Sequence, residues 1–506
     1  RAQFMDQEVV FEVADNRGVM LVITLVVQFD FVPELKNPLY SLLFIHNKQQ
    51  MYEKTPYIYI LKHIYQMLLR SFAPKRGASY TKFSDITPTV LAALASELSL
   101  SHIWFTGVIR HATAGEEGVK GLCGSPYAIS DYHDVNPYLG SMQDFEALVR
   151  RSHRAGLKVI IDFVPNHVAR AYSGSEFDEG NFYPGRGYDY DWSDTAKLNY
   201  ESRATWDKML EILLFWASKG VDGFRCDMIE LVRTDFWHWA LARVKKEHPG
   251  IVFIGEAYQP EKYAELYDWG GFDYLYDKSG MYDSLKDIER GWRRADDLTR
   301  CWQSLREADR SKMLRFLENH DEDRYMSWGH PLQGGAEGEA PQFQSSVLCS
   351  TLMWKSPFML YFGQEFGHSA KTSIFDPDKV DAMSRWVKGL RGDDVEKYLA
   401  DNEKAYYAQY KSLLKMSAQD DVFVLGETFD LVYANYGNVG FNPERHFAWL
   451  RGHNGRVVLC VASFEDCAAN LNVRIPEHAS RYFGVRLPEE VSLHTEPFSG
   501  TYRELL

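Results

Sequence analysis

Between about residue 60 and residue 370, short apolar runs alternate with longer segments in which apolar residues recur at helical spacing. The short runs have the length of strands, and their alternation with helical segments predicts parallel strands joined by crossover helices. Eight such units are expected to close into an α/β fold, the (β/α)8 TIM barrel, whose active sites lie at the carboxyl ends of the strands. The expected strands lie near residues 61–68, 101–106, 157–163, 221–226, 251–255, 272–276, 313–318 and 357–362.

Two of the intervening helices carry clear local signals. Ser141 and Asp144 have the spacing of a capping box, which predicts a helix that runs to Gly156. A second amphipathic helix is expected over residues 206–218, because apolar residues recur on one face before Gly220. Both helices fall between expected strands, as a barrel requires.

The barrel is expected to occupy residues 61–400, with two additions. After the third strand, a stretch rich in Gly, Tyr, Asp and Ser at about 168–199 is too long for an ordinary connection and predicts a loop subdomain. Residues 401–506 begin with a helix and continue with short apolar runs at 422–425, 447–450 and 457–462. These runs predict a C-terminal antiparallel β-sandwich domain.

Residues 1–60 are interpreted as a separate β-rich extension. Residues 8–14 and 19–31 have the pattern of two strands around a turn at 15–18. Two strands alone are marginally stable, so this hairpin is expected to pack on another surface and to stabilise or assemble the protein. Its apolar run at 19–27 is too short to span a bilayer, so we expect no membrane partner.

Composition narrows the class of partner. The chain has 506 residues, of which 45% are hydrophobic and 25% charged, and a formal net charge of −14. This is the balance of a globular protein, and the negative charge argues against nucleic acid while remaining compatible with a neutral substrate. The six cysteines include no C-x-x-C pair, so neither a zinc site nor a disulfide scaffold is expected, and Cys226 is interpreted as a buried structural thiol. No signal peptide is visible, which favours the cytoplasm unless a leader has been removed, and the oligomeric state is left open.

Four short motifs place acidic and imidazole groups just after expected strands. They are DFVPNH (162–167), GFRCD (223–227), IGE (254–256) and ENHD (318–321). Because residues two apart on a strand face the same way, Arg225 and Asp227 are expected to point together into the barrel mouth. Glu256 follows the fifth expected strand and Asp321 the seventh, so both would converge on the same cavity from adjacent or near-adjacent strands. Paired carboxylates of this kind are what glycoside hydrolysis uses, one as nucleophile and one as proton donor.

In order and spacing, the four motifs resemble the signature regions of the α-amylase family, glycoside hydrolase family 13. The resemblance implies that Asp227 is the nucleophile, Glu256 the general acid/base and Asp321 a third acid that binds sugar hydroxyls. It also implies that Arg225 keeps Asp227 ionised. The family pattern further implies three sugar-binding side chains, which are His167, His320 and, within the segment 125–132, the stacking residue Tyr127.

The sequence departs from the family pattern at two positions that bear on specificity and calcium. Ala128 follows the stacking tyrosine where many members have Asp, and Leu231 stands where many calcium-binding members have His. Asn166 occupies a position that often supplies a calcium ligand, with Asp178 in the following loop. We therefore expect that no cofactor is required and that this calcium site is empty, with the alternative that other oxygen groups complete it.

These observations predict a retaining glycosidase that cleaves α-glucosidic bonds, mainly α-1,4, in starch-like glucans or malto-oligosaccharides. A transglucosidase, isomerase or phosphorylase would use the same glucosyl-enzyme intermediate, and only the acceptor pocket separates these activities. A non-catalytic relative, such as a transporter accessory subunit, would normally have lost some of the acids that Asp227, Glu256 and Asp321 retain.

Overall fold

The computed structural model describes residues 61–172, 174–328, 344–392, 395 and 397–505. The chain divides into two units, residues 1–58 and 59–506, and the described residues all belong to the second. The predicted β-rich extension at residues 1–60 lies outside the described residues. Within the described part, no helix is long and apolar enough to cross a membrane.

Eight parallel strands close into a barrel, as the apolar runs predicted. Around the barrel the order is β1-β12-β11-β10-β9-β8-β5-β2, so each strand lies beside those that precede and follow it among the barrel strands. Every strand except β5, β9 and β10 is buried along its whole length, because one face fills the barrel and the other packs against helices. The strands are β1 (His63–Leu68), β2 (His102–Thr106), β5 (Lys158–Phe163), β8 (Gly223–Cys226), β9 (Val252–Gly255), β10 (Tyr274–Tyr276), β11 (Met313–Phe316) and β12 (Phe358–Tyr361).

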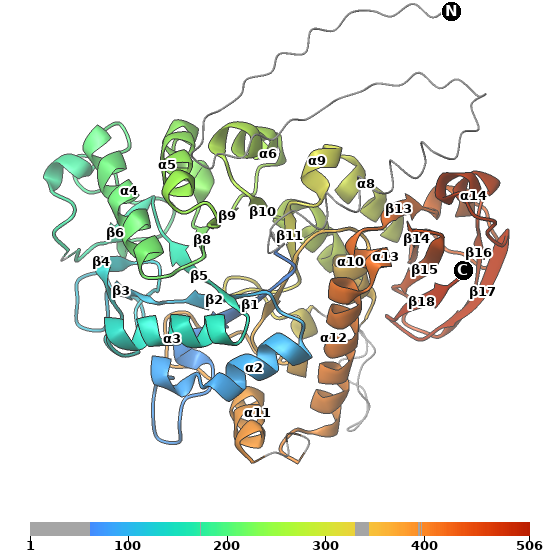
Figure 1. The fold of residues 1–506 in the computed structure, drawn as a ribbon, viewed down its shortest axis with the longest axis horizontal. Coiled ribbons are helices and arrows are strands. Elements are labelled where there is room, and N and C mark those ends of the chain that lie inside the picture. The colour runs from blue at the N-terminus through green and yellow to red at the C-terminus, as the bar shows by residue number, and fades with distance from the viewer. Residues whose placement is uncertain (1–60, 173, 329–343, 393–394, 396, 506) are drawn as a thin grey trace, which may run out of the picture. The chain divides into compact units, whose positions relative to one another are not determined.

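Helices surround these strands (Figure 1). Helix α3 begins after Ser141, whose hydroxyl accepts a hydrogen bond from Asp144 N while the Asp144 carboxylate accepts one from Ser141 N, as the capping box predicted. The chain leaves α3 through Gly156, whose φ of +83° suits a residue without a Cβ. The helices of the barrel region are α2 (Pro88–Glu97), α3 (Met142–Arg154), α4 (Arg203–Ser218), α5 (Thr234–Glu247), α6 (Tyr263–Glu265), α7 (Asp283–Glu289), α8 (Leu298–Gln303), α9 (Glu307–Arg310), α10 (Ser345–Leu352), α11 (Asp381–Arg391) and α12 (Asp401–Gln419).

Two small antiparallel sheets stand above the carboxyl ends of the strands. Strands β3 (Ile109–His111) and β4 (Ile129–Val135) form one sheet in the connection after β2. Strands β6 (His167–Ala169) and β7 (Thr195–Lys197) form the other, at the two ends of the stretch that the sequence marked as a loop subdomain. The subdomain is therefore anchored at its base by a short sheet.

The C-terminal part is built from two antiparallel sheets. One has the order β13-β14-β15-β18 and the other pairs β16 with β17. Along β15, Val457, Leu459 and Val461 face an apolar core that includes Leu471 and Val491 of the two-stranded sheet, whereas the alternate residues join the large core of the barrel region. The elements are β13 (Glu427–Asp430), β14 (His446–His453), β15 (Arg456–Ser463), β16 (Ala469–Arg474), β17 (Glu490–Thr495), β18 (Gly500–Glu504) and α14 (Glu477–Phe483).

The prediction of a strand at 422–425 was wrong. These residues lie in a helical turn, α13 (Asp421–Val424), which begins where the Asp420 carboxylate accepts a hydrogen bond from Val422 N. Val422 and Phe423 are buried, and an apolar run this short fits a buried helical turn as well as a strand. A 3-10 helix at Val432–Asn435 and helix α14 are further helical elements in a tail that the sequence had suggested was all β after its first helix.

Candidate active site

The carboxyl ends of three strands bring the predicted acids together. Arg225 is the third residue of β8, and Asp227 follows that strand directly. Glu256 follows β9 directly, and Asp321 lies five residues beyond β11. In the parallel register Arg225 stands beside Ile254 of β9 on one side and Asp162 of β5 on the other. The barrel thus places the acids at one edge, as the alternation of side chains predicted.

Arg225 is the centre of the cluster. Its Nη1 donates to Asp227 Oδ1 at 2.6 Å, and its Nη2 lies 2.9 Å from Glu256 Oε1 without the alignment of a hydrogen bond. Its side chain has no exposed surface, so it lies beneath the two acids. Burial alone would lower the pKa of Arg225, but the surrounding acidic groups, led by Glu256, raise it well above its usual value. One permanent positive charge is therefore shared between two carboxylates.

Asp162 is a further member of this cluster. Its Oδ1 lies 3.8 Å from Arg225 Nη1 and accepts a hydrogen bond from the Tyr127 hydroxyl at 3.2 Å. Its Oδ2 accepts from Trp104 Nε1 at 3.1 Å. Burial raises the pKa of Asp162, and Arg225 and these donors oppose that rise. Asp162 thereby fixes the hydroxyl end of the predicted stacking residue, Tyr127.

Glu256 has the environment of a proton donor. Its Oε1 accepts a hydrogen bond from the Tyr258 hydroxyl at 2.6 Å, and its Oε2 accepts one from Met228 N at 2.8 Å. Burial raises its pKa to about 7, with the charges of Asp227 and Asp321 adding to the rise while Arg225 opposes it. A carboxyl group with this pKa holds a proton over a large part of the neutral range.

Asp227 has a raised pKa like Glu256, whereas the pKa of Asp321 is lowered. Burial raises the pKa of Asp227, but its ion pair with Arg225 acts in the opposite direction. Asp321 lines the cleft, and its side chain is 43% exposed to the solvent that fills the cleft. Burial would raise its pKa, yet His320, whose Nε2 lies 2.9 Å from Asp321 Oδ2, holds that pKa at about 2. Asp321 is therefore the most firmly ionised of the three.

The predicted sugar-binding side chains also gather here. The rings of Tyr127 and His320 are stacked with centroids 4.9 Å apart, and Gln66 Nε2 lies 2.8 Å from His320 Nδ1. The ring centroid of His167 lies 5.3 Å from that of Trp192. Burial lowers the pKa of His167 to about 4, so this imidazole is neutral near pH 7 and can both donate and accept a hydrogen bond.

These groups surround a cleft of about 950 Å³, which is large enough for a small ligand. Its lining combines the acids with aromatic and apolar side chains from the loop subdomain and from the loop after β12. The lining residues are Lys120, Ser125, Tyr127, His167, Tyr190, Asp191, Trp192, Asp194, Thr195, Asp227, Met228, Glu256, Tyr258, His320, Asp321, Lys371, Thr372, Ser373, Ile374 and Phe375.

Sequence reasoning missed several side chains that complete this site. Tyr258 stands two residues after Glu256, so the same alternation that paired Arg225 with Asp227 would have pointed to it. Gln66 is a polar residue within a fully buried strand, which is a signal for a buried hydrogen bond. No local pattern distinguishes Trp192 or Lys371 from other loop residues, because only the fold brings them to the cleft.

The residues that the family pattern offers to calcium make the following contacts within the protein. Asn166 Nδ2 donates to Asp189 Oδ2 at 2.8 Å, and Asn166 Oδ1 is buried without a hydrogen-bond partner among the described residues. The other oxygen of Asp189 accepts from Lys197 Nζ at 2.7 Å. A lysine ammonium therefore balances the Asp189 charge, whereas calcium needs oxygen ligands. Asp178, the other candidate, caps the turn at Glu179–Asn181 by accepting from Gly180 N.

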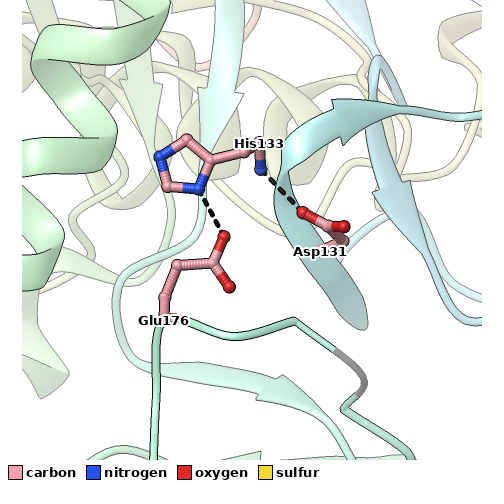
Figure 2. A group of neighbouring side chains, drawn as sticks. All are labelled: Asp131, His133 and Glu176. Atoms are coloured by element: carbon pink, nitrogen blue, oxygen red, sulfur yellow. Dashed lines mark hydrogen bonds and ion pairs between the residues drawn. The ribbon is translucent and has the colours of Figure 1, made fainter.

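One other group of side chains has metal-ligand chemistry. Figure 2 shows His133 between Asp131 and Glu176, with ligand atoms that lie within 4.8 Å of one another. His133 Nδ1 lies 2.5 Å from Glu176 Oε1, and Asp131 Oδ1 accepts from His133 N at 2.9 Å. Tyr172 donates to the second Glu176 oxygen. These groups bond to one another and link β4 to the loop subdomain, so a structural link accounts for them.

A closed parallel barrel with buried acids gathered round one arginine at the carboxyl ends of its strands defines the chain as a glycosidase-type enzyme. The alpha-amylase model, described as "Alpha amylase, catalytic domain", matches residues 94–192 and 175–421, which together cover well over half of the chain. The chain belongs to the α-amylase family.

Individual relatives are distant and carry different activities. Alpha-amylase MalA of Haloarcula japonica is 27% identical over 338 residues, which cover 63% of this chain and 46% of that protein. The chain thus spans about half the length of that relative. Alpha-amylase 3 of Dictyoglomus thermophilum is 24% identical over 409 residues, covering 70% of this chain and 76% of that protein. An alpha-1,4-glucan:maltose-1-phosphate maltosyltransferase of Corynebacterium pseudotuberculosis is 32% identical over 168 residues, 30% of this chain and 25% of that protein.

Solved structures share the fold. The crystal structure of an alpha-amylase from Lactobacillus plantarum superposes with a TM-score of 0.67 at 22% identity, covering 89% of this chain and 100% of that one. Together with the family match, this likeness confirms the predicted barrel fold.

Proposed function

We propose that the protein is a retaining glycoside hydrolase that cleaves α-glucosidic bonds, mainly α-1,4, in starch-like glucans or malto-oligosaccharides. The observation that supports this proposal most directly is the sharing of Arg225 between Asp227 and Glu256. The shared guanidinium holds two carboxyl groups side by side at one end of the cleft floor. Burial raises the pKa of both groups, that of Glu256 to about 7, while Asp227 has the hydrogen bond from Arg225 that favours its ionised form.

The first step joins the sugar to the protein. Asp227, held ionised by Arg225, attacks the anomeric carbon with one carboxylate oxygen, and the bond from that carbon to the glycosidic oxygen breaks. Glu256 has a pKa of about 7, so part of the enzyme carries a proton on this group near neutral pH. That proton is transferred to the departing oxygen. The products are a glucosyl ester on Asp227, a free leaving sugar and an ionised Glu256.

The second step reverses the roles. Glu256, now a carboxylate, removes a proton from a water molecule as the water oxygen attacks the anomeric carbon, and the ester bond to Asp227 breaks. Two inversions at one carbon leave the released sugar in the α configuration. Asp321, ionised at any neutral pH, accepts hydrogen bonds from sugar hydroxyls, with His167 and His320 as further partners and Tyr127 as the stacking surface.

Proton NMR of fresh reaction mixtures tests this mechanism. With maltopentaose as substrate, the α anomer of the new reducing end appears first and the β anomer grows only as mutarotation proceeds. Initial release of the β anomer would rule out a covalent intermediate on Asp227. Chromatography of the same mixtures separates hydrolysis from transfer, because transfer to sugar acceptors produces oligosaccharides longer than the substrate.

A further inference from the structure

One side of the cleft is lined by two loops that are bonded to each other. Residues 120–124 belong to the connection after β2, and residues 371–376 belong to the connection after β12. Cys123 N donates to Phe375 O at 2.7 Å, and Leu122 N donates to Asp376 Oδ1 at 3.0 Å. We call these two joined segments the bridge. Because Lys120 and residues 371–375 all line the cleft, the bridge forms a continuous part of its wall.

The contact within the bridge is close. Gly121 has a φ of +67°, and a Cβ at this position would lie 2.6 Å from Phe375 O and 2.8 Å from Phe375 Cβ. Only glycine allows the two backbones to approach this far. The loop after β12 is also held internally, because Asp376 N donates to Ser373 Oγ and Ser373 N donates to Asp378 Oδ2, each at 3.1 Å.

Two further contacts tie the bridge to its surroundings. Lys120 Nζ lies 3.1 Å from Asp194 Oδ1 and donates to Asp191 O at 2.9 Å, which joins the bridge to the loop subdomain. The buried Arg70, which follows β1, donates to Gly124 O at 3.2 Å. The wall therefore continues from the loop subdomain to the loop after β12, and several contacts hold it in place.

The barrel order shows which end of a substrate meets this wall. The bridge joins the connections after β2 and β12, the two neighbours of β1. Strand β9, which Glu256 follows, lies four strands from β1 in either direction round the barrel. Glu256 is the proposed donor to the leaving sugar, so the leaving part of the substrate departs on the β9 side. The retained part, which bears the anomeric carbon, lies on the side of the bridge.

Two residues of the site support this orientation within the proposed mechanism. Tyr127, the proposed stacking surface for the retained sugar, stands four residues after Cys123 of the bridge. Lys371 of the bridge donates to the backbone oxygen of Asp321, which is proposed to hold the hydroxyls of the same sugar. In a linear α-glucan, the retained part is the one that carries the non-reducing end. The bridge therefore faces the non-reducing end of a bound chain.

We propose that the bridge closes the cleft beyond a short retained unit, so that the enzyme acts from the non-reducing ends of linear α-glucans and does not cleave within long chains. This inference rests on the proposed function, since it uses the roles of Glu256, Tyr127 and Asp321. It assigns the specificity to residues 120–124 and 371–376, none of which carries a proposed catalytic role.

A pair of matched substrates tests the proposal with the full-length protein. One is 4-nitrophenyl α-maltoheptaoside with a free non-reducing end, and the other is the same compound with that end blocked by an ethylidene group at O4 and O6. We expect the free compound to be consumed at least about tenfold faster, because the blocked end does not fit against the bridge. Equal rates for the two compounds would overturn the proposal. If neither is consumed, the proposed function fails and this inference falls with it.

A variant tests whether the bridge itself is the barrier. Asp376→Ala removes the acceptor of Leu122 N, and we expect it to narrow the ratio of free to blocked consumption severalfold. Asp207→Ala, on an exposed position of α4, is the control and should leave the ratio unchanged. Circular dichroism and melting temperature show whether both variants are folded. A second variant, Gly121→Val, forces the two backbones apart, because a Cβ at this position would lie 2.6 Å from Phe375 O. Wild-type ratios in both folded variants would show that the bridge is not the barrier.

Discussion

Tyr258 donates a hydrogen bond from its hydroxyl to Glu256 Oε1 at 2.6 Å, although the two residues are only two positions apart in the chain. The strand direction persists past the end of β9, so both side chains point into the cleft. The bond stabilises the ionised form of the group that is proposed to donate a proton. It therefore opposes the effect of burial, which raises the pKa of Glu256 to about 7.

Tyr258→Phe is predicted to raise the pKa of Glu256 further. The proposed acid works only while it is protonated, so kcat/KM falls as the pH rises through that pKa. Without the tyrosine hydroxyl, the carboxylate loses a donor and the alkaline limb of the pH profile of kcat/KM moves to higher pH. Tyr433→Phe, in the C-terminal part, is the control with an unshifted profile. An alkaline limb that stays in place or moves to lower pH in Tyr258→Phe would contradict the assignment.

Asp227→Asn is predicted to lower kcat by about 10³-fold or more, because an amide is a poor nucleophile and the shape of the side chain barely changes. The fold should persist, since Arg225 keeps its contacts with Glu256 and Asp162. Consumption of maltopentaose and the melting temperature are measured on the same preparation, with Asp207→Asn on the surface of α4 as the control. A variant that retains a tenth of the activity would remove Asp227 from the role of nucleophile.

The sequence was sufficient for the barrel and for the core of the site because both depend on local patterns. Each barrel strand is a short apolar run, and Asp227 and Glu256 directly follow such runs, so strand alternation places them at one edge. The short run at 422–425 was misread because a run of only four apolar residues fits a strand and a helical turn equally well.

Long-range contacts could not be predicted in this way. Cys123 and Phe375 are some 250 positions apart, and nothing in either segment indicates that the two backbones touch. The same holds for Lys197 and Asp189, whose ion pair depends on the path of the loop subdomain between β6 and β7. The specificity of the site and its charge balance are therefore properties of loops packed against each other, and they appear only in the folded chain.

Lys197 is predicted to make the loop subdomain independent of calcium. Chelation with EDTA should leave the melting temperature of the protein unchanged, and added calcium should not raise it, because an ammonium already balances Asp189. A melting temperature that falls with chelator and returns with calcium would contradict this prediction.

Lys197→Met gives a second measurement of the same arrangement. The pair is only partly exposed, at 28% for Lys197 and 20% for Asp189, so loss of the ammonium leaves a half-buried carboxylate without its cation. We expect the free energy of unfolding to fall by about 1–2 kcal/mol. Lys208→Met breaks the exposed pair with Glu211 and should cost less than about 0.5 kcal/mol. Equal effects of the two substitutions in urea titrations would show that Lys197 has no special structural role.

Arg451 joins the C-terminal sheet to the barrel region, and its replacement is predicted to destabilise the whole described unit. The guanidinium is completely buried and donates to four backbone oxygens, those of Leu352 at 2.8 Å, Val422 at 3.2 Å, and Phe423 and Gly426 at 2.9 Å. Arg451→Met leaves these oxygens buried without that donor, so we expect the free energy of unfolding to fall by about 3 kcal/mol or more.

Arg456→Met is the control, because it breaks only exposed pairs with Asp420 and Glu504. It should change the free energy of unfolding by less than about 1 kcal/mol. Urea titration followed by tryptophan fluorescence compares the two variants, and an Arg451→Met protein as stable as Arg456→Met would show that the contacts of Arg451 contribute little to holding the sheet on the barrel.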